Sequence, residues 1–468
     1  MRYISTRGAA PALSFTDVLL TGLARDGGLY VPEAWPRLDA AQIRALRGLS
    51  YEEIAFRVMQ PFIGAEIADA DLKAIIDASY ATFRHQAIVP LKQLDDNLWF
   101  MELFHGPTLA FKDVALQLVG RLYDHVLGKR GQRITIVGAT SGDTGSAALE
   151  ACRDRAGIDI FILHPKGRVS EVQRRQMTTI PSANVFNIAI DGSFDDCQDI
   201  VKAMFNDHVF RDSINMSAVN SINWARVMAQ IVYYASAAVS LGAPDRRIGF
   251  SVPSGNFGNI FAGYAARQMG FDLAPLIVGA NRNDILARFF KTGRMEISDV
   301  VPSLSPSMDI QVSSNLERLL FDLFDRDGAA LAKAMTEFRA TGRFAAPAKN
   351  WAKIQDLFHA ASLDDAGTLE VMKSLHAKTG ELIDPHSAIG IHAAAQCRTD
   401  RETPIVALGT AHPAKFPDAV QRATGIRPEL PAFLADLHGR PERMAGLPNN
   451  LRAVQDYVLS HRRNDRNA

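Results

Sequence analysis

Residues 133–152 read Arg-Ile-Thr-Ile-Val-Gly-Ala-Thr-Ser-Gly-Asp-Thr-Gly-Ser-Ala-Ala-Leu-Glu-Ala-Cys, and this stretch decides the fold class. Its opening residues are mostly β-branched and predict a strand, the glycine-rich middle predicts a turn, and the alanine-rich end predicts a helix. Further apolar runs have the length of buried strands, at residues 158–163, 185–190, 248–252 and 404–408. Apolar strands that alternate with helices predict an α/β fold with parallel sheets flanked by helices.

The rest of the chain divides by pattern. Its 468 residues predict about three structural units. Residues 40–85 carry Ala, Leu and Ile at helical spacing and predict an N-terminal helical subdomain. Residues 285–400 are poor in glycine and predict a mainly helical subdomain next to the sheet. The last 40 or so residues are polar and predict a peripheral segment.

Composition and charge exclude several classes of protein. The 51 Lys and Arg residues balance 51 Asp and Glu residues, so no broad basic surface for nucleic acid is expected. The most apolar stretch, Val227–Leu241, is shorter than the roughly 20 residues of a membrane span and predicts a buried helix. The cysteines fit neither a zinc pattern nor a disulfide framework, and the N-terminus has no apolar signal region. We therefore expect a cytoplasmic protein without nucleic-acid or membrane partners.

Common motifs are absent, and two glycine-containing turns remain. The sequence has no GxG triplet, no P-loop, no HExxH and no GxSxG. Ser254–Gly258 follows a predicted strand and opens a helix, where converging N–H groups favour an anion such as phosphate. Thr140–Gly145 is similar and suits a carboxylate. Taken alone, the first turn is equally consistent with an ordinary tight turn, and the second is better explained as a helix cap.

Lys112 is the third feature, because it is the single cation within Leu109-Ala-Phe-Lys-Asp-Val-Ala-Leu116. Burial lowers the pKa of a lysine and frees the amine for Schiff-base chemistry. On this octapeptide alone, a lysine that only snorkels from a helix start is the preferred interpretation. An apolar lysine, two anion-binding turns and no nucleotide motif together predict a pyridoxal phosphate enzyme, because that cofactor needs an amine, a phosphate cup and a partner for its pyridine nitrogen.

Eight segments together resemble threonine synthases, pyridoxal phosphate enzymes with the type II, tryptophan-synthase-like fold. They extend over most of the chain, roughly residues 1–425, and lie at residues 27–32, 105–113, 138–145, 220–226, 252–259, 307–315, 384–390 and 409–416. The resemblance implies a threonine-synthase-like N-terminal domain at 1–98 and a pyridoxal phosphate core at 99–425. It leaves 426–468 as a C-terminal peripheral segment.

The resemblance also implies a role for each matched position. Lys112 would hold pyridoxal 5'-phosphate as a Schiff base and act as the catalytic base, and Thr410 would approach the pyridine nitrogen. The cofactor phosphate would bind at the turn made of Gly255, Asn256, Phe257, Gly258 and Asn259. The substrate carboxylate or the ring edge would be met by Ser141, Gly142, Asp143 and Thr144. The substrate phosphate would be bound by Asn220, Ser221 and Arg226, with Lys415 as a weaker candidate.

The implied reaction is a β,γ-replacement that converts O-phospho-L-homoserine and water to L-threonine and phosphate, the last step of threonine biosynthesis. One alternative is a serine or threonine dehydratase of the same fold, but a hydroxyl leaving group needs no anion site at 220–226. A second is a non-catalytic relative, which the intact Lys112 disfavours. Arg226 has its own plain alternative, a salt bridge on a helix. We expect a monomer or a homodimer.

Overall fold

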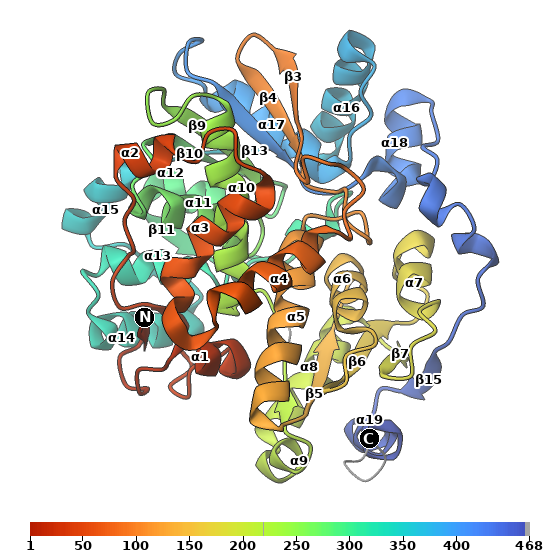
Figure 1. Ribbon diagram of the computed structural model, residues 1–468. Coiled ribbons are helices and arrows are strands. Elements are labelled where there is room, and N and C mark those ends of the chain that lie inside the picture. The colour runs from red at the N-terminus through yellow and green to blue at the C-terminus, as the bar shows by residue number, and fades with distance from the viewer. Residues whose placement is uncertain (219, 464–468) are drawn as a thin grey trace.

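Two sheets organise the protein, for which a computed structural model describes residues 1–218 and 220–463 (Figure 1). The larger sheet has the strand order β13-β10-β9-β14-β4-β3 and is parallel except for the β3·β4 pair. Its strands are β3 (Leu91–Asp95), β4 (Leu98–Glu102), β9 (Ile248–Pro253), β10 (Leu273–Ala280), β13 (Phe358–Ser362) and β14 (Ile405–Gly409). Helices cover this sheet, as expected for buried parallel strands.

The smaller sheet contains the strand predicted at the start of residues 133–152. Its order is β15-β7-β6-β5-β8, and every pair in it is parallel. Its strands are β5 (Ile134–Ala139), β6 (Ile158–Pro165), β7 (Val185–Asp191), β8 (Met216–Ser217) and β15 (Ala445–Pro448). The helices of this half are α6 (Asp143–Cys152), α7 (Glu171–Thr178), α8 (Phe194–Asn206) and α9 (His208–Ser213). The predicted apolar strands and the α/β class are therefore confirmed.

Two long helices join the halves. The apolar stretch 227–241 lies within α10 (Trp224–Ser240), which is buried on almost every side and packs against α11 (Gly258–Gln268). The helix α5 (Lys112–Arg130) runs beside α10 and packs on α6. A helix that is apolar all round belongs in a core, so α10 is the buried helix that the sequence predicts.

The N-terminal residues share a core with these helices. Their elements are β1 (Tyr3–Ser5), α1 (Phe15–Thr21), β2 (Tyr30–Pro32), α2 (Ala40–Arg44), α3 (Tyr51–Ile63), η1 (Gly64–Glu66) and α4 (Asp69–Tyr80). The helices predicted over 40–85 are α2, α3 and α4. In Figure 1 α3 lies in front of α10 and α4 lies at the start of α5, which agrees with the packing of these two pairs. The Phe62 and Trp224 rings are 5.6 Å apart. The boundary at residue 98 stays a prediction.

Residues 285–400 are mainly helical, and one strand among them enters the larger sheet. The elements are α12 (Ile285–Thr292), β11 (Arg294–Glu296), η2 (Pro306–Met308), α13 (Leu316–Leu323), α14 (Gly328–Thr341), β12 (Arg343–Ala345), α15 (Ala348–Gln355), β13, α16 (Asp365–Thr379) and α17 (Pro385–Cys397). Because β13 pairs in parallel with β10, this region is attached directly to the sheet that carries the site.

The end of the chain returns to the smaller sheet. Its elements are η3 (Pro413–Lys415), α18 (Pro417–Thr424), η4 (Ala432–Leu434), η5 (Leu437–Gly439), β15 and α19 (Leu451–His461). The strand β15 is an edge strand beside β7, and Val454 and Val458 of α19 are fully buried. Figure 1 shows this segment passing from the upper half to the lower half along one side. The described part of 426–463 thus closes one edge of the smaller sheet.

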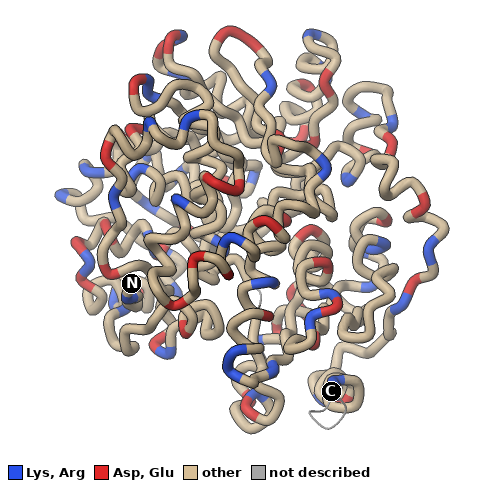
Figure 2. Tube along the Cα trace, viewed as in Figure 1, with Lys and Arg blue, Asp and Glu red and all other residues tan. Residues whose placement is uncertain are grey.

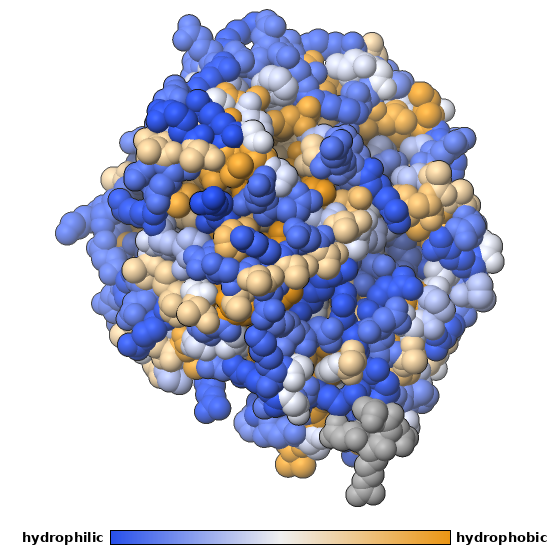
Figure 3. All heavy atoms as spheres, viewed as in Figure 1, coloured by the Kyte–Doolittle hydropathy of each residue, from blue (hydrophilic) through white to orange (hydrophobic). Residues whose placement is uncertain are grey.

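Charged residues of both signs are interspersed along the trace in Figure 2, and the face in Figure 3 is mostly hydrophilic with scattered apolar side chains. Within residues 1–218 and 220–463, no helix has both the length and the apolar character needed to cross a bilayer.

Candidate active site

Lys112 and Thr410 are held side by side by a short piece of backbone pairing. The Phe111 N–H donates to the Thr410 carbonyl over 2.8 Å, and the His412 N–H donates to the Leu109 carbonyl over 3.0 Å. Leu109 takes a positive φ of 63°, which turns the chain into the start of α5. The segment after β14 therefore fixes the position of the first residue of α5, Lys112.

The amine of Lys112 is enclosed. Only 8% of the residue is exposed, and Nζ lies 3.4 Å from Asp143 Oδ2 and 4.7 Å from the centre of the Phe111 ring. Burial lowers the pKa of Lys112, Asp143 opposes this effect, and the positive charges of Lys415 and Arg226 add to it. A lysine in these surroundings supplies a neutral amine more readily than an exposed one does.

Asp143 lies between two ammonium groups. Its Oδ1 is 2.8 Å from Lys415 Nζ and accepts a hydrogen bond from Gln173 Nε2 over 2.8 Å, while Oδ2 faces Lys112. Burial disfavours the charged carboxylate, but Lys415 and Lys112 hold the pKa of Asp143 well below its usual range. Lys415 is fully buried and also donates to the Thr108 carbonyl over 2.7 Å. Asp143 therefore suits a position beside the ring of the predicted pyridoxal phosphate better than one at the substrate carboxylate, because two carboxylates repel each other.

The turn before α6 contains the other predicted residues of the segment 138–145. Thr140 Oγ1 accepts from the N–H groups of Gly142 and Gly145 at 3.0 and 2.8 Å. Gly142 has φ 142°, and a Cβ there would lie 2.4 Å from Gln173 Oε1. Only glycine fits both requirements. Ser141 and Thr144 are half-buried on the same turn, so their hydroxyls are suited to an anionic group.

The turn 254–258 forms a cup at the start of α11. A Cβ on Gly255 would lie 2.9 Å from the Ser307 carbonyl oxygen and 3.0 Å from Met308 Cα. Phe257 adopts a left-handed φ of 62°, a conformation that costs a residue with a side chain about 1–2 kcal/mol. The close packing and the strained turn bring backbone N–H groups together at a helix N-terminus, which suits a phosphate.

Asn259 lies one residue further, in the first turn of α11. Its Oδ1 accepts from the hydroxyl groups of Tyr233 and Tyr234 at 2.5 and 3.0 Å. Its Nδ2 is buried and has no hydrogen-bond partner among the described residues. A buried amide donor without a partner is costly, so this side chain fits a site that receives an acceptor.

Arg226 lies in the first turn of α10 and is 4% exposed. Its Nε and Nη1 have no hydrogen-bond partner within the described part of the chain. Burial lowers the pKa of Arg226 to about 10, and its charge is among those that lower the pKa of Lys112. The salt bridge considered from the sequence is not formed by these two nitrogens, and a guanidinium fork is available near Lys112.

Asn220 and Ser221 precede Arg226, and Ser221 contacts the cup directly. Asn256 Nδ2 donates to Ser221 Oγ over 3.0 Å, which joins the two loops. Asn220 is half-buried, and its Oδ1 accepts from the Ile222 N–H over 3.3 Å. Ion pairs join Lys112 and Lys415 to Asp143, and a backbone hydrogen bond places Thr410 beside the start of α5. Ser221 is joined to Asn256 of the cup, and the positive charge of Arg226 acts on Lys112.

Sequence reasoning gave no role to several residues that support the site. Thr410 N–H donates to Ser387 Oγ over 3.2 Å, and Ser387 in turn donates to Asp384. Gln173 supports Asp143 from α7. The segment 384–390 is one of the matched motifs. Its sequence does not predict a contact with Thr410, because the two are distant in the chain.

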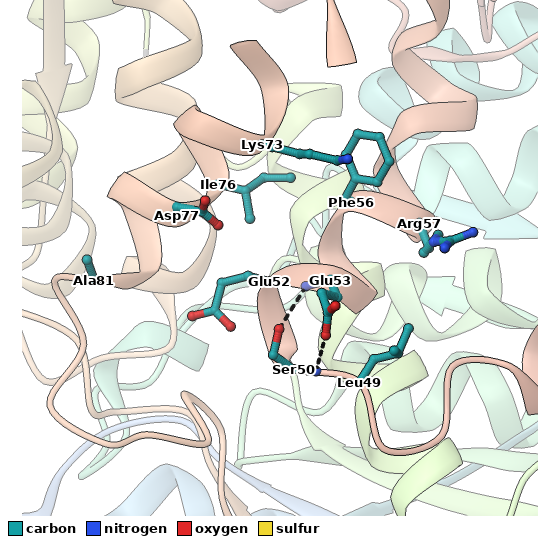
Figure 4. A pocket seen from close by; sticks show the side chains of 10 residues that line it. All are labelled: Leu49, Ser50, Glu52, Glu53, Phe56, Arg57, Lys73, Ile76, Asp77 and Ala81. Carbon is teal, nitrogen blue, oxygen red and sulfur yellow. Dashed lines mark hydrogen bonds between the residues drawn. The ribbon is translucent and has the colours of Figure 1, made fainter. Parts of the chain in front are cut away.

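A separate cavity of about 530 Å³ lies over α3 and α4 (Figure 4). Ser50 and Glu53 cap each other's N–H groups in its wall, and Lys73 Nζ lies 4.6 Å above the Phe56 ring. None of the predicted site residues lines this cavity. Two of its charged side chains have a structural role, because Glu53 caps α3 and Lys73 lies over the Phe56 ring.

Comparison with known families covers almost all of this architecture. Residues 2–80 match the family "Threonine synthase N terminus", residues 83–352 match "Pyridoxal-phosphate dependent enzyme", and residues 387–458 match "Threonine synthase, C-terminal". A threonine synthase from Pseudomonas aeruginosa is 58% identical, with 98% of each chain covered. The chain belongs to the threonine synthase family.

Solved structures of the threonine synthase family agree with the fold. The crystal structure of threonine synthase from Brucella melitensis with bound pyridoxal phosphate matches with a TM-score of 0.97 at 53% identity, covering 99% of this chain and 100% of that one. Threonine synthase from yeast matches with a TM-score of 0.93 at 39% identity and 98% coverage of both chains. The predicted type II fold is confirmed.

The cofactor of this threonine synthase family member is pyridoxal 5'-phosphate. Three observations agree with this group: the buried amine of Lys112, the cup whose glycine has no room for a Cβ, and the unpartnered Nδ2 of Asn259. Thr410 and Lys112 are fixed to each other by backbone hydrogen bonds, as a ring bound between them requires. The individual residue assignments stay predictions.

Proposed function

We propose that the enzyme converts O-phospho-L-homoserine and water to L-threonine and phosphate. The choice of substrate rests on Arg226, a buried guanidinium near Lys112. Two of its nitrogens have no hydrogen-bond partner in the described chain. A charged fork in a dry site is costly unless an anion binds it. A phosphate ester of a small amino acid supplies an anion in addition to the carboxylate that the proposal places at the turn 140–145, whereas serine and threonine have the carboxylate alone.

The cup at Gly255–Asn259 would hold the cofactor phosphate, and Lys112 and Thr410 would hold the ring. When bound, pyridoxal phosphate delocalises the negative charge that develops on the substrate. The Thr410 hydroxyl is the neutral partner of the pyridine nitrogen. Ser141 and Thr144 hold the substrate carboxylate through their hydroxyl groups, Gly142 gives the turn its shape, and Asp143 keeps its two lysines in place.

Lys112 Nζ takes the proton from the substrate Cα, because burial and two neighbouring cations make its neutral form accessible. Arg226, Asn220 and Ser221 bind the phosphate that leaves Cγ and stabilise the charge that grows on it. A proton is lost from Cβ as the bond from Cγ to the phosphate oxygen breaks, and a proton is then added at Cγ. Water adds to Cβ, and the proton returned to Cα completes threonine. Since phosphate is both the binding group and the leaving group, loss of Arg226 should lower kcat as well as raise KM.

The decisive assay measures phosphate release from O-phospho-L-homoserine together with threonine formation. Lys112→Ala should abolish both products and the visible absorbance band that borohydride removes from the wild-type holoenzyme. Lys129→Ala, a change at the exposed end of the same helix, should leave both unchanged. Full turnover by Lys112→Ala, or release of a keto acid from serine or threonine without phosphate turnover, would refute the proposal.

We also propose a cytoplasmic location, which the three unpaired cysteines Cys152, Cys197 and Cys397 support, since thiols persist in a reducing compartment. The oligomeric state, a monomer or a homodimer, stays a prediction that analytical ultracentrifugation decides.

A further inference from the structure

One amide group connects the two loops that the proposed function assigns to the two phosphates. Asn315, fully buried, donates from Nδ2 to the Ser221 carbonyl over 3.2 Å and to the Asn256 carbonyl over 3.1 Å. Its own N–H also donates to the Asn256 carbonyl over 3.2 Å. Ser221 belongs to the substrate-phosphate loop and Asn256 to the cofactor-phosphate cup. A single planar group therefore spans both.

Arg318, one turn further along α13, locks this amide. The guanidinium is fully buried and donates to Asn315 Oδ1, which orients the amide so that Nδ2 faces the two loops. It also donates to the Ile222 carbonyl, within the substrate-phosphate loop, and from Nε to the Tyr30 carbonyl over 3.0 Å. Unlike Arg226, this arginine has an acceptor for each of its Nε, Nη1 and Nη2 groups. All three groups therefore bind the protein itself and are not available to a ligand.

The N-terminal part of the chain holds α13 in place. Arg7 binds Glu317 through two contacts, Nε to Oε1 at 3.0 Å and Nη2 to Oε2 at 2.9 Å, and Thr6 Oγ1 donates to Glu317 Oε1 over 2.8 Å. Tyr30 lies in the motif 27–32, which had no assigned role. The motif at residues 27–32 and the motif at 307–315 are thus parts of one connection between the N-terminal segment and the phosphate loops.

We infer that Asn315 and Arg318 are positioning residues that fix the relative position of the two phosphate loops and so select the chain length of the phosphorylated amino acid. The inference rests on the proposed function. The proposed function holds the substrate at the cofactor through its amino group and at the substrate-phosphate loop through its phosphate. The position of that loop relative to the cup therefore limits how many carbons fit between Cα and the substrate phosphate. A substrate shortened by one carbon falls short by up to about 1.5 Å, and misplacement of this order is costly in an active site.

Two phosphonates provide the test on the holoenzyme. 2-Amino-5-phosphonopentanoate has as many atoms between Cα and phosphorus as O-phosphohomoserine, and 2-amino-4-phosphonobutanoate has one fewer. The inhibition constants of both are measured against phosphate release, and binding is checked by the change in the visible cofactor band. The wild type should bind the longer compound more tightly.

Asn315→Asp keeps the acceptor for Arg318 and the size of the side chain, but it replaces both loop-binding donors with an acceptor. We expect the preference for the longer phosphonate to fall at least about tenfold, which is the size of one of the two lost hydrogen bonds. The dissociation constant of pyridoxal phosphate from the apoenzyme should rise as well. Arg318→Lys, which keeps the charge and loses the fork, should shift the preference in the same direction and serves as the test where Asn315→Asp does not fold.

Arg326→Met is the matched control. Arg326 also joins the end of α13 to the N-terminal segment, through the Pro32 and Glu33 carbonyls, but the structure shows no contact of it with either phosphate loop. It should lower the melting temperature and leave the preference unchanged. A wild-type preference in both Asn315→Asp and Arg318→Lys, or an equal loss in Arg326→Met, would overturn the inference. A wild type that neither turns over O-phosphohomoserine nor binds either phosphonate would overturn the proposed function instead.

Discussion

Replacing Arg226 by methionine should make the protein more stable while it destroys activity. The guanidinium is buried, and its pKa falls from 12.5 to about 10 because burial disfavours the charge. This difference corresponds to about 3 kcal/mol of destabilisation of the folded state by the charged side chain. The folded-state pKa is the lower of the two, so the cost is fully present below about pH 10 and disappears only as the pH rises toward 12.5.

Methionine has a similar volume and no charge, so Arg226→Met should recover part or all of this free energy. For a chain of 468 residues the unfolding entropy is about 1 kcal/mol per kelvin, so the melting temperature should rise by up to about 3 °C. The measurement is the thermal unfolding of holoenzymes in a buffer free of phosphate. Arg318→Met provides the contrast, because that equally buried arginine has three acceptors that would lose their donors, and its melting temperature should fall.

Added phosphate separates a binding role from a packing effect. Inorganic phosphate at about 100 times its dissociation constant should stabilise the wild type by about 2.7 kcal/mol and leave Arg226→Met almost unaffected. Turnover of O-phosphohomoserine should fall by more than about 100-fold in the variant, as for other lost charge-stabilising groups. A lower melting temperature for Arg226→Met, or an undiminished response to phosphate, would refute the view that Arg226 is a buried charge kept for an anion.

Two further predictions concern the cofactor side of the site. Gly255→Ala should weaken pyridoxal phosphate binding by about tenfold or more, because the added Cβ would meet the backbone. Fluorescence titration of the apoenzyme measures this affinity. The control is Gly128→Ala, at a helix position with open space, which should keep the wild-type affinity. Lys415→Met should lower the free energy of unfolding by about 3–5 kcal/mol, because it leaves Asp143 with one cation instead of two. Removing that positive charge also raises the pKa of Lys112, so the acidic limb of the profile of kcat against pH should move to higher pH. Adding Asp143→Asn to Lys415→Met should restore part of the lost stability. Equal stability of Lys415→Met and the wild type would contradict the view that Asp143 needs both cations.

Local patterns predicted the elements well where one signal dominated. The apolar runs became β5, β6, β7, β9 and β14, and the apolar stretch from residue 227 became the buried helix α10. Their burial follows from composition alone, because such segments have no polar face to leave in water. The assignment of β13 to the larger sheet was not predicted, since residues 358–362 lie in a helical region and pair with a strand far away in the sequence.

The candidate site divides in the same way. The motifs identified the loops, because glycine, hydroxyl and basic residues at strand ends reveal an anion site from their chemistry. Pairings between those loops had no local signal. Asp143 with Lys415, Thr410 with Ser387, and Asn315 with Ser221 each join residues separated by 23 or more positions.

The sequence by itself determined the fold class, the family and the chemistry of the cleft, because strand and helix patterns and motif residues depend on near neighbours in the chain. Only the tertiary structure decided which charges are neutralised and which are free. Lys415 and Arg226 are both basic residues in matched motifs, yet Lys415 is bound to Asp143 while two nitrogens of Arg226 have no partner in the described chain. The difference lies in what folding brings within hydrogen-bond distance of each group, and that distance is set by the packing of helices and loops far apart in sequence.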